Sequence, residues 1–259
     1  MSLSQEPVFS ELKNKFVCTS KDITNEPYCG KSGRHAPTGK GISTTNGAGP
    51  HNLQLFVLAP DGTVLHCLPG YWAPQDLVHE LKLAEDLFTV WKNPQLSRGQ
   101  KNQMFKQMQL SHLNEHPTDM VRRSRMQGFD QKFEAKNRPY QSDTVKNPQL
   151  AVQALAQNNN KLLAQAFKTT DQIAHERMAQ RPFVPYSQFD VAVYTDYGKQ
   201  RYEKNEDFRD MSGQLVMNPK TGEAIPPGQR KMQKRSGVQN FQGGRMRRMR
   251  NNMLSNGSL

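Results

Sequence analysis

The segment His112-Leu113-Asn114-Glu115-His116 has the residue types and spacing in this chain that best suit metal chemistry. Two histidines four positions apart lie on one face of a helix and can share a zinc ion, with Glu115 as a base. The segment stands at a helix end directly before Pro117, without a surrounding apolar run and without an obvious third ligand on a downstream helix. We therefore interpret it as a solvated polar helix end and predict neither a metal site nor a cofactor.

The chain has three cysteines, Cys18, Cys29 and Cys67, and no two of them have the C-x-x-C spacing of a zinc knuckle or a redox dithiol. We expect three reduced thiols, with Cys18 and Cys67 on strands. Cys29 is the candidate reactive thiol, because Lys31 and Arg34 stand near it in the sequence and cations lower the pKa of a thiol. An ordinary loop thiol is the alternative that we favour at this position.

Residues 224–259 contain eight basic and no acidic side chains, so this segment carries +8 of the formal net charge of +12. Such a segment is expected to be disordered and to bind nucleic acid or an anionic surface weakly and without sequence preference. A solubilising tail without a dedicated partner is the alternative. The candidate polyanion-binding residues are Arg230, Lys231, Lys234, Arg235, Arg245, Arg247, Arg248 and Arg250.

The first part of the chain is predicted to combine a β-hairpin with helices. Two apolar runs over residues 53–68 flank the turn Pro60-Asp61-Gly62, in which proline presets φ and glycine accepts a positive φ. An amphipathic helix is expected over residues 75–91 and a short helix over residues 6–15. Residues 16–18 are expected to form a strand beside the hairpin.

This order of elements, with Gly70-Tyr71 after the hairpin, resembles the C-terminal half of the thioredoxin fold over residues 1–93. The resemblance implies an α/β domain in which residues 16–18 form the second strand of that fold. Thioredoxin domains begin with a strand and a C-x-x-C dithiol, whereas the 15 residues before Phe16 contain no cysteine. For the cis-proline that the family places before its hairpin, the one candidate is Pro50.

We therefore expect an incomplete thioredoxin-like domain that does not exchange disulfides by the usual route. It is either a non-catalytic relative or the remainder of a thiol–disulfide oxidoreductase whose N-terminal segment is missing, so its status as an enzyme is open. The alternative function is a basic-tailed adaptor that binds nucleic acid or another polyanion. Either function implies a protein partner that the sequence does not identify.

The chain after the thioredoxin-like region is predicted to contain a polar helical region over residues 94–182, with helices over residues 97–116 and 149–181. An aromatic-rich extended segment over residues 183–223 and the basic tail follow. We expect the aromatic side chains of this segment to pack onto the body of the protein, and the stacking of nucleic-acid bases is the alternative.

Composition limits the size of the core, because only 35% of the 259 residues are hydrophobic and the mean hydropathy is -0.82. A single core over the whole chain is therefore not expected. No apolar run reaches the ~18 residues of a membrane span, and no signal peptide is visible at the start. These features predict a cytoplasmic protein if Met1 is the true start, and an exported one if an N-terminal segment is missing.

Overall fold

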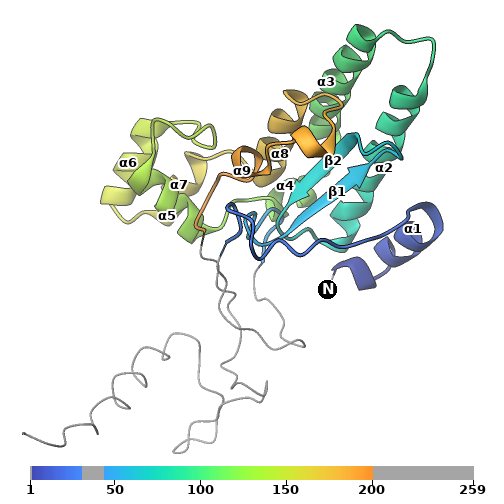
Figure 1. The fold of residues 1–259 in the computed structure, drawn as a ribbon. Coiled ribbons are helices and arrows are strands. Elements are labelled where there is room, and N and C mark those ends of the chain that lie inside the picture. The colour runs from blue at the N-terminus through green and yellow to red at the C-terminus, as the bar shows by residue number, and fades with distance from the viewer. Residues whose placement is uncertain (1, 31–43, 201–259) are drawn as a thin grey trace, which may run out of the picture. The chain divides into compact units, whose positions relative to one another are not determined.

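Helices and one antiparallel hairpin make up the folded part of the chain (Figure 1). The computed structural model describes residues 2–30 and 44–200, all of which belong to one compact unit of mixed α/β structure. In chain order the elements are η1 Ser2–Ser4, α1 Val8–Lys15, β1 Gln54–Leu58, β2 Val64–Pro69, α2 Pro74–Lys92, α3 Arg98–Glu115, α4 Thr118–Arg123, α5 Gly128–Asn137, α6 Pro148–Ala156, α7 Asn160–Gln165, α8 Thr170–Ala179, η2 Tyr186–Gln188 and α9 Val191–Tyr194.

The predicted hairpin is confirmed. β1 and β2 pair antiparallel, with Gln54 opposite Pro69 at the open end. Gly62 has a φ of +83° in the turn, where a side chain would be strained. The Asp61 carboxylate accepts a hydrogen bond from the backbone N–H of Thr63 at 3.0 Å, which closes the turn. The sheet of the described residues consists of these two strands alone.

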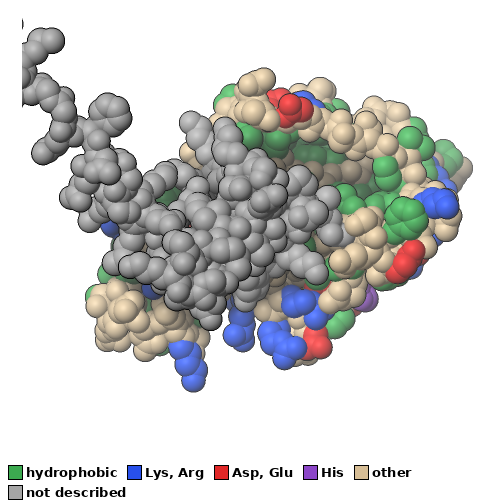
Figure 2. All heavy atoms as spheres, turned by 90° about the horizontal axis from the view of Figure 1, so that it is seen from below, with side chains coloured by type: hydrophobic (Ala, Val, Ile, Leu, Met, Phe, Trp, Pro, Cys, Tyr) green, Lys and Arg blue, Asp and Glu red, His purple; other side chains and the backbone are tan. Residues whose placement is uncertain are grey.

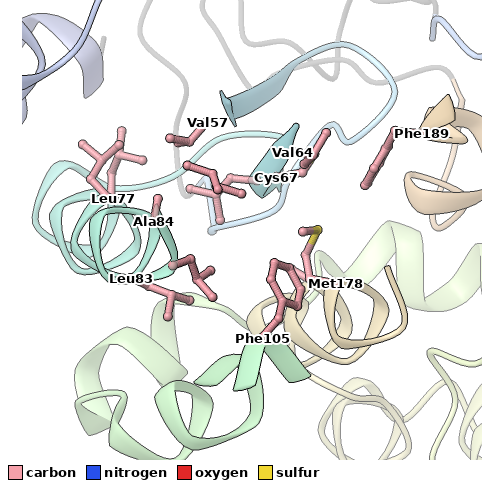
Figure 3. Packing of buried hydrophobic residues seen from close by; sticks show 14 of the residues in the cluster. Val57, Val64, Cys67, Leu77, Leu83, Ala84, Phe105, Met178 and Phe189 are labelled. Atoms are coloured by element: carbon pink, nitrogen blue, oxygen red, sulfur yellow. The ribbon is translucent and has the colours of Figure 1, made fainter. Parts of the chain in front are cut away.

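The predicted helix after the hairpin is also confirmed, as α2. In Figure 3, Leu77 and Ala84 of α2 point toward the hairpin, and Phe105 of α3 and Met178 of α8 enter the same core. Each large apolar side chain buried in this way contributes about 1.5–3 kcal/mol to folding. The core therefore joins the consecutive helices α2 and α3, and the distant helix α8, to the sheet.

The predicted strand at residues 16–18 is wrong. These residues form no strand, Val17 is fully exposed, and Cys18 is exposed as well. The hairpin instead pairs locally with a segment from the other end of the fold, because the N–H of Val64 donates to the carbonyl of Val184 at 2.9 Å. The short apolar run at residues 16–18 predicted a strand beside the hairpin. In the structure it is instead the segment around Val184 that forms a backbone hydrogen bond with the hairpin near its turn.

The helical region differs from the prediction in its second half. α3 begins, as expected, after Ser97, which forms a reciprocal capping box with Gln100. The helix predicted over residues 149–181 is wrong, because α6, α7 and α8 replace it. Asn158 has a φ of +49° after α6, and the Asn159 side chain caps α7. Asparagine side chains compete with helical hydrogen bonds and so interrupt helices.

The aromatic side chains of the last described segment pack into the body, as we expected. Phe183, Tyr194 and Tyr197 are buried. The Tyr194 hydroxyl donates to the carbonyl of Cys67 at 2.6 Å, and the Tyr197 hydroxyl donates to the carbonyl of Gly47 at 2.7 Å. Tyr202 and Phe208 lie outside the described residues. Burial of these rings leaves them unavailable for stacking on bases.

Helices α5, α6 and α7 enclose a second, smaller apolar cluster. Its buried members are Met126, Ala135, Ala151, Ala154, Leu163, Ala166, Phe167, Ile173 and Tyr197.

In the part of the chain that the structure describes, no helix combines the length and the apolar character that crossing a membrane requires.

Candidate metal centre

A cluster of histidines and one glutamate lies between α2, α3 and α8. Glu80 is in the middle of α2, His112 and His116 are at the end of α3, and His175 is in α8. On α3 the buried Phe105 is followed at helical spacing by Gln109, His112 and His116. Intervals of four, three and four residues keep side chains on one face of a helix, so the face that enters the core also carries both histidines.

The donor atoms of Glu80, His112, His116 and His175 lie within 4.8 Å of one another. Nε2 of His116 and Nε2 of His175 lie 3.2 Å and 3.3 Å from Oε1 of Glu80. Nε2 of His112 lies 3.6 Å from Oε2 of the same carboxylate. A tetrahedral zinc ion with bonds of about 2.1 Å holds its ligand atoms about 3.4 Å apart. The two distances to Oε1 of Glu80 are therefore close to the edge length of a zinc coordination tetrahedron, and Nε2 of His112 lies on the Oε2 side of the same carboxylate.

Burying the polar atoms of this cluster costs folding free energy unless they have hydrogen-bond partners or a bound ion. The side chains of Glu80 and His175 are fully buried, and that of His116 is 1% exposed. His112, at 15% exposed, lies nearest to solvent. Nε2 of His112 has no hydrogen-bond partner, and Nε2 of His116 lies 3.2 Å from Oε1 of Glu80 without a well-aligned hydrogen bond. Buried polar atoms are nearly always paired, so these two nitrogens, which face one carboxylate, have the capacity to bind a further ligand.

A second layer of polar side chains orients the cluster. Nδ1 of His116 lies 3.0 Å from Oδ2 of Asp171, and Nδ1 of His175 lies 2.7 Å from Oε1 of Gln109. Metal-binding histidines commonly donate their second ring N–H to an oxygen in this way, which turns the other nitrogen toward the metal. Both of these histidines are therefore held with Nε2 toward the centre.

The pKa values of the cluster follow from burial and from mutual charge. Burial alone would raise the pKa of Glu80, but His175, His116 and His66 hold it well below its usual range. Burial lowers the pKa of His112 to about 4. Burial would also lower the pKa of His116, but its bonds to Asp171 and Glu80 prevail and raise that pKa to about 9. Glu80 is thus an anion, and His112 is a neutral imidazole with a free lone pair at neutral pH.

The structure changes the interpretation of the H-x-x-E-H segment. We expected a solvated helix end, yet His116 is buried and His175 supplies the third histidine that we did not find in the sequence. Glu115, the expected base, is exposed, and Glu80 of another helix supplies the carboxylate. One signal in the sequence was the spacing of the histidines from Phe105.

The candidate thiol and the candidate cis-proline do not join this cluster. The thiol of Cys29 is partly buried and donates to the carbonyl of Gly30 at 3.3 Å, while Lys31 and Arg34 lie outside the described residues. Among the described residues the cis peptide bond precedes Pro7. The bond before Pro50 is therefore not cis, in contrast to the prediction.

Cys67 lies on β2 as expected and is buried, whereas Cys18 is exposed outside any strand. The eight candidate polyanion-binding residues between Arg230 and Arg250 lie outside the described residues. On the face drawn in Figure 2, the Lys and Arg side chains of the described residues are dispersed among hydrophobic and neutral ones. The prediction of polyanion binding concerns the basic segment, whose charge comes from the sequence.

Comparison of the chain with models of protein families, with curated proteins and with solved structures finds no match. The cluster of Glu80, His112, His116 and His175 is consequently the feature of the molecule that bears most directly on function.

Proposed function

We propose that this protein binds one zinc ion through Glu80, His112, His116 and His175, and that the ion holds α2, α3 and α8 together. The observation that carries the proposal is the convergence of four donor atoms within 4.8 Å of one another, two of which are buried imidazole nitrogens without a well-aligned hydrogen bond. Imidazole and carboxylate ligands suit zinc well, and four such ligands satisfy its preferred coordination.

The charges of the cluster support a dication. Glu80 and Asp171 are both fully buried and together can supply two negative charges next to the three imidazoles. A buried carboxylate is costly unless a positive charge compensates it. Zn²⁺ with neutral imidazoles would balance both carboxylates, whereas a protonated His116 alone balances one.

All four proposed ligands are protein side chains, as in structural zinc sites. Catalytic zinc sites use three protein ligands and leave the fourth position to water or substrate. The proposed role is therefore structural. It assigns the metal to the stability of the fold rather than to turnover of a substrate.

Metal analysis of the purified full-length chain, followed by a zinc titration of the metal-free protein, tests the proposal. We expect one zinc per chain. The His112→Ala variant should bind zinc at least tenfold more weakly, because it removes one ligand at the exposed edge, where the fold tolerates truncation best. The matched control is His79→Ala, because His79 is the exposed residue next to Glu80 on α2.

Zinc affinity should be unchanged in His79→Ala. Failure of the wild-type protein to bind zinc, or equal affinity in His112→Ala and wild type, would contradict the proposal. If another divalent transition metal binds more tightly than zinc and its binding also depends on His112, the proposed site is supported and its metal is that ion instead of zinc.

The thioredoxin-like interpretation of residues 1–93 stays a prediction. The order of the hairpin and α2 agrees with it, whereas the absence of a strand at residues 16–18 does not. We propose it as a resemblance of the hairpin and α2 only, and it assigns no redox chemistry to the chain.

Polyanion binding by the basic segment is a second, independent proposal, which is supported by its charge of +8. Without residues 228–259 the chain keeps +4 (12 minus 8). Binding of a labelled oligonucleotide, measured by fluorescence anisotropy, should be weak at low salt and should fall further as salt rises. It should disappear when residues 228–259 are deleted. Undiminished binding by the shortened chain would exclude the segment as the binding site.

A further inference from the structure

A hydrogen-bonded bridge joins two of the proposed metal ligands on the side away from the metal. It is formed by Gln109 of α3 and His66 of β2, both of which are fully buried. Oε1 of Gln109 lies 2.7 Å from Nδ1 of His175, and Nε2 of Gln109 lies 3.4 Å from Nδ1 of His66. Nε2 of His66 lies 2.8 Å from Oε2 of Glu80. The bridge therefore begins at one ligand, His175, and ends at another, Glu80.

The chemistry of the carboxamide fixes the direction of every bond in this bridge. An amide oxygen only accepts hydrogen bonds and an amide nitrogen only donates them. Nδ1 of His175 must therefore carry a proton, and Nδ1 of His66 must carry a lone pair. A neutral His66 then has its proton on Nε2 and donates it to Glu80.

We propose that Gln109 and His66 are positioning residues that set the tautomer of His175 and select the oxygen of Glu80 that binds the metal. This inference rests on the proposed zinc site. With a proton on Nδ1, His175 presents the lone pair of Nε2 to the metal. Nε2 of His175 lies 3.3 Å from both oxygens of Glu80, and Nε2 of His116 lies 3.2 Å from Oε1. With Oε2 occupied by the proton from His66, Glu80 presents Oε1 to the metal.

The arrangement of the rings supports the same assignment. The rings of His66 and His175 are stacked, with centroids 5.3 Å apart and planes at 24° to each other. Neither ring can rotate freely within this stack, and Gln109 spans the Nδ1 atoms of both. The hairpin thus takes part in the metal centre through His66, although it supplies no ligand to the metal.

Long-range ¹H–¹⁵N correlation spectra of the zinc-loaded full-length protein test the assignment without a mutation, because they show which nitrogen of each histidine carries a proton. We expect the proton on Nδ1 in His175 and on Nε2 in His66. A proton on Nδ1 of His66, or on Nε2 of His175, would overturn the proposal. That result would mean that the carboxamide of Gln109 is turned the other way.

The Gln109→Met variant tests the consequence for the metal, because methionine has a similar length but neither donates to His66 nor accepts from His175. We expect the zinc affinity to fall about 10- to 100-fold, as is typical when an outer-layer partner of a metal ligand is removed. We also expect His66 to lose its single tautomer. Gln107→Met, at an exposed position of the same helix, is the matched control and should behave as wild type.

A purely structural role of Gln109 would lower the melting temperature but would leave the zinc affinity and the tautomers unchanged, and this outcome would refute the inference. Absence of zinc binding in the wild-type protein would instead refute the proposed function itself. The two failures are therefore distinguishable.

Discussion

Two regions of the molecule bury carboxylates among helices, and they compensate them in different ways. In the region of α5, Glu134 accepts hydrogen bonds from Arg138 at 2.8 Å and from the N–H of Gly198 at 2.7 Å. Asp130 accepts a hydrogen bond from the N–H of Lys199 at 2.8 Å. Each carboxylate of the α5 region thus has a donor supplied by the chain.

The cluster between α2, α3 and α8 lacks this completeness. Glu80 faces several imidazoles, but neither Nε2 of His112 nor Nε2 of His116 makes a well-aligned hydrogen bond. The difference distinguishes a polar network whose hydrogen bonds are complete from the cluster that we propose binds an ion.

The largest expected effect is that of metal removal. A chelator should lower the free energy of unfolding of the full-length protein by about 4 kcal/mol relative to protein with free zinc at a thousandfold excess over its Kd. Thermal unfolding followed by circular dichroism measures this effect. The same chelator should not change the melting temperature of His112→Ala to the same extent. Equal shifts in both proteins would mean that the stabilisation does not come from the cluster.

A smaller effect is expected when the ion pair of the α5 region is broken. Arg138→Ala leaves Glu134 buried without its guanidinium partner and should cost about 3 kcal/mol, the lower end for a buried pair, since Arg138 is partly exposed. Denaturant unfolding measures it, and the zinc affinity should be unchanged. The control is Arg122→Ala, which removes an exposed pair with Asp119 and should cost less than about 1 kcal/mol. A loss of zinc affinity in Arg138→Ala would show that the two regions are coupled.

The smallest expected effect is the pH dependence that Asp130 contributes. Burial, with a further contribution from Glu134, raises the pKa of Asp130 to about 7 from 3.8, against the hydrogen bond from Lys199. The folded protein therefore holds this proton more tightly than the unfolded chain, and stability falls as pH rises through this range. From pH 5 to 8 the stability of wild type should fall relative to Asp130→Asn by about 2–3 kcal/mol at most, because one pKa unit corresponds to about 1.4 kcal/mol.

Denaturant unfolding of both proteins at several pH values measures this difference, and contributions from the histidine cluster cancel between the two. A difference that stays constant over the same range would show that Asp130 keeps an ordinary pKa. In that event the α5 region would be fully compensated at every pH, and its contrast with the histidine cluster would be sharper.

Local patterns in the sequence predicted those elements whose signals are local. The turn Pro60-Asp61-Gly62 between two apolar runs predicted the hairpin, and the spacing of Leu77, Leu81 and Ala84 predicted α2. The prediction of a strand at residues 16–18 was wrong because a strand needs a neighbouring strand to pair with, and these three residues do not specify one. The prediction of one helix over residues 149–181 was wrong because it relied on the helical spacing of apolar residues and gave too little weight to the asparagines at 158–160.

The histidine cluster was missed because its members come from three helices and become neighbours only through packing. The pattern of His112 and His116 was visible, but Pro117 suggested exposure, and nothing local connected the pair to Glu80 or His175. A stricter use of helical spacing would have placed both histidines on the face of Phe105. It would not have identified their partners.

The hydroxyl bonds of Tyr194 and Tyr197 also bear on the order in which the fold is completed during synthesis. They reach back over 127 and 150 residues, to the carbonyls of Cys67 and Gly47. The hairpin and α2 are thus synthesised long before Tyr194, which packs in their core. Long-range closure of this kind slows folding and leaves apolar surface uncovered in the growing chain.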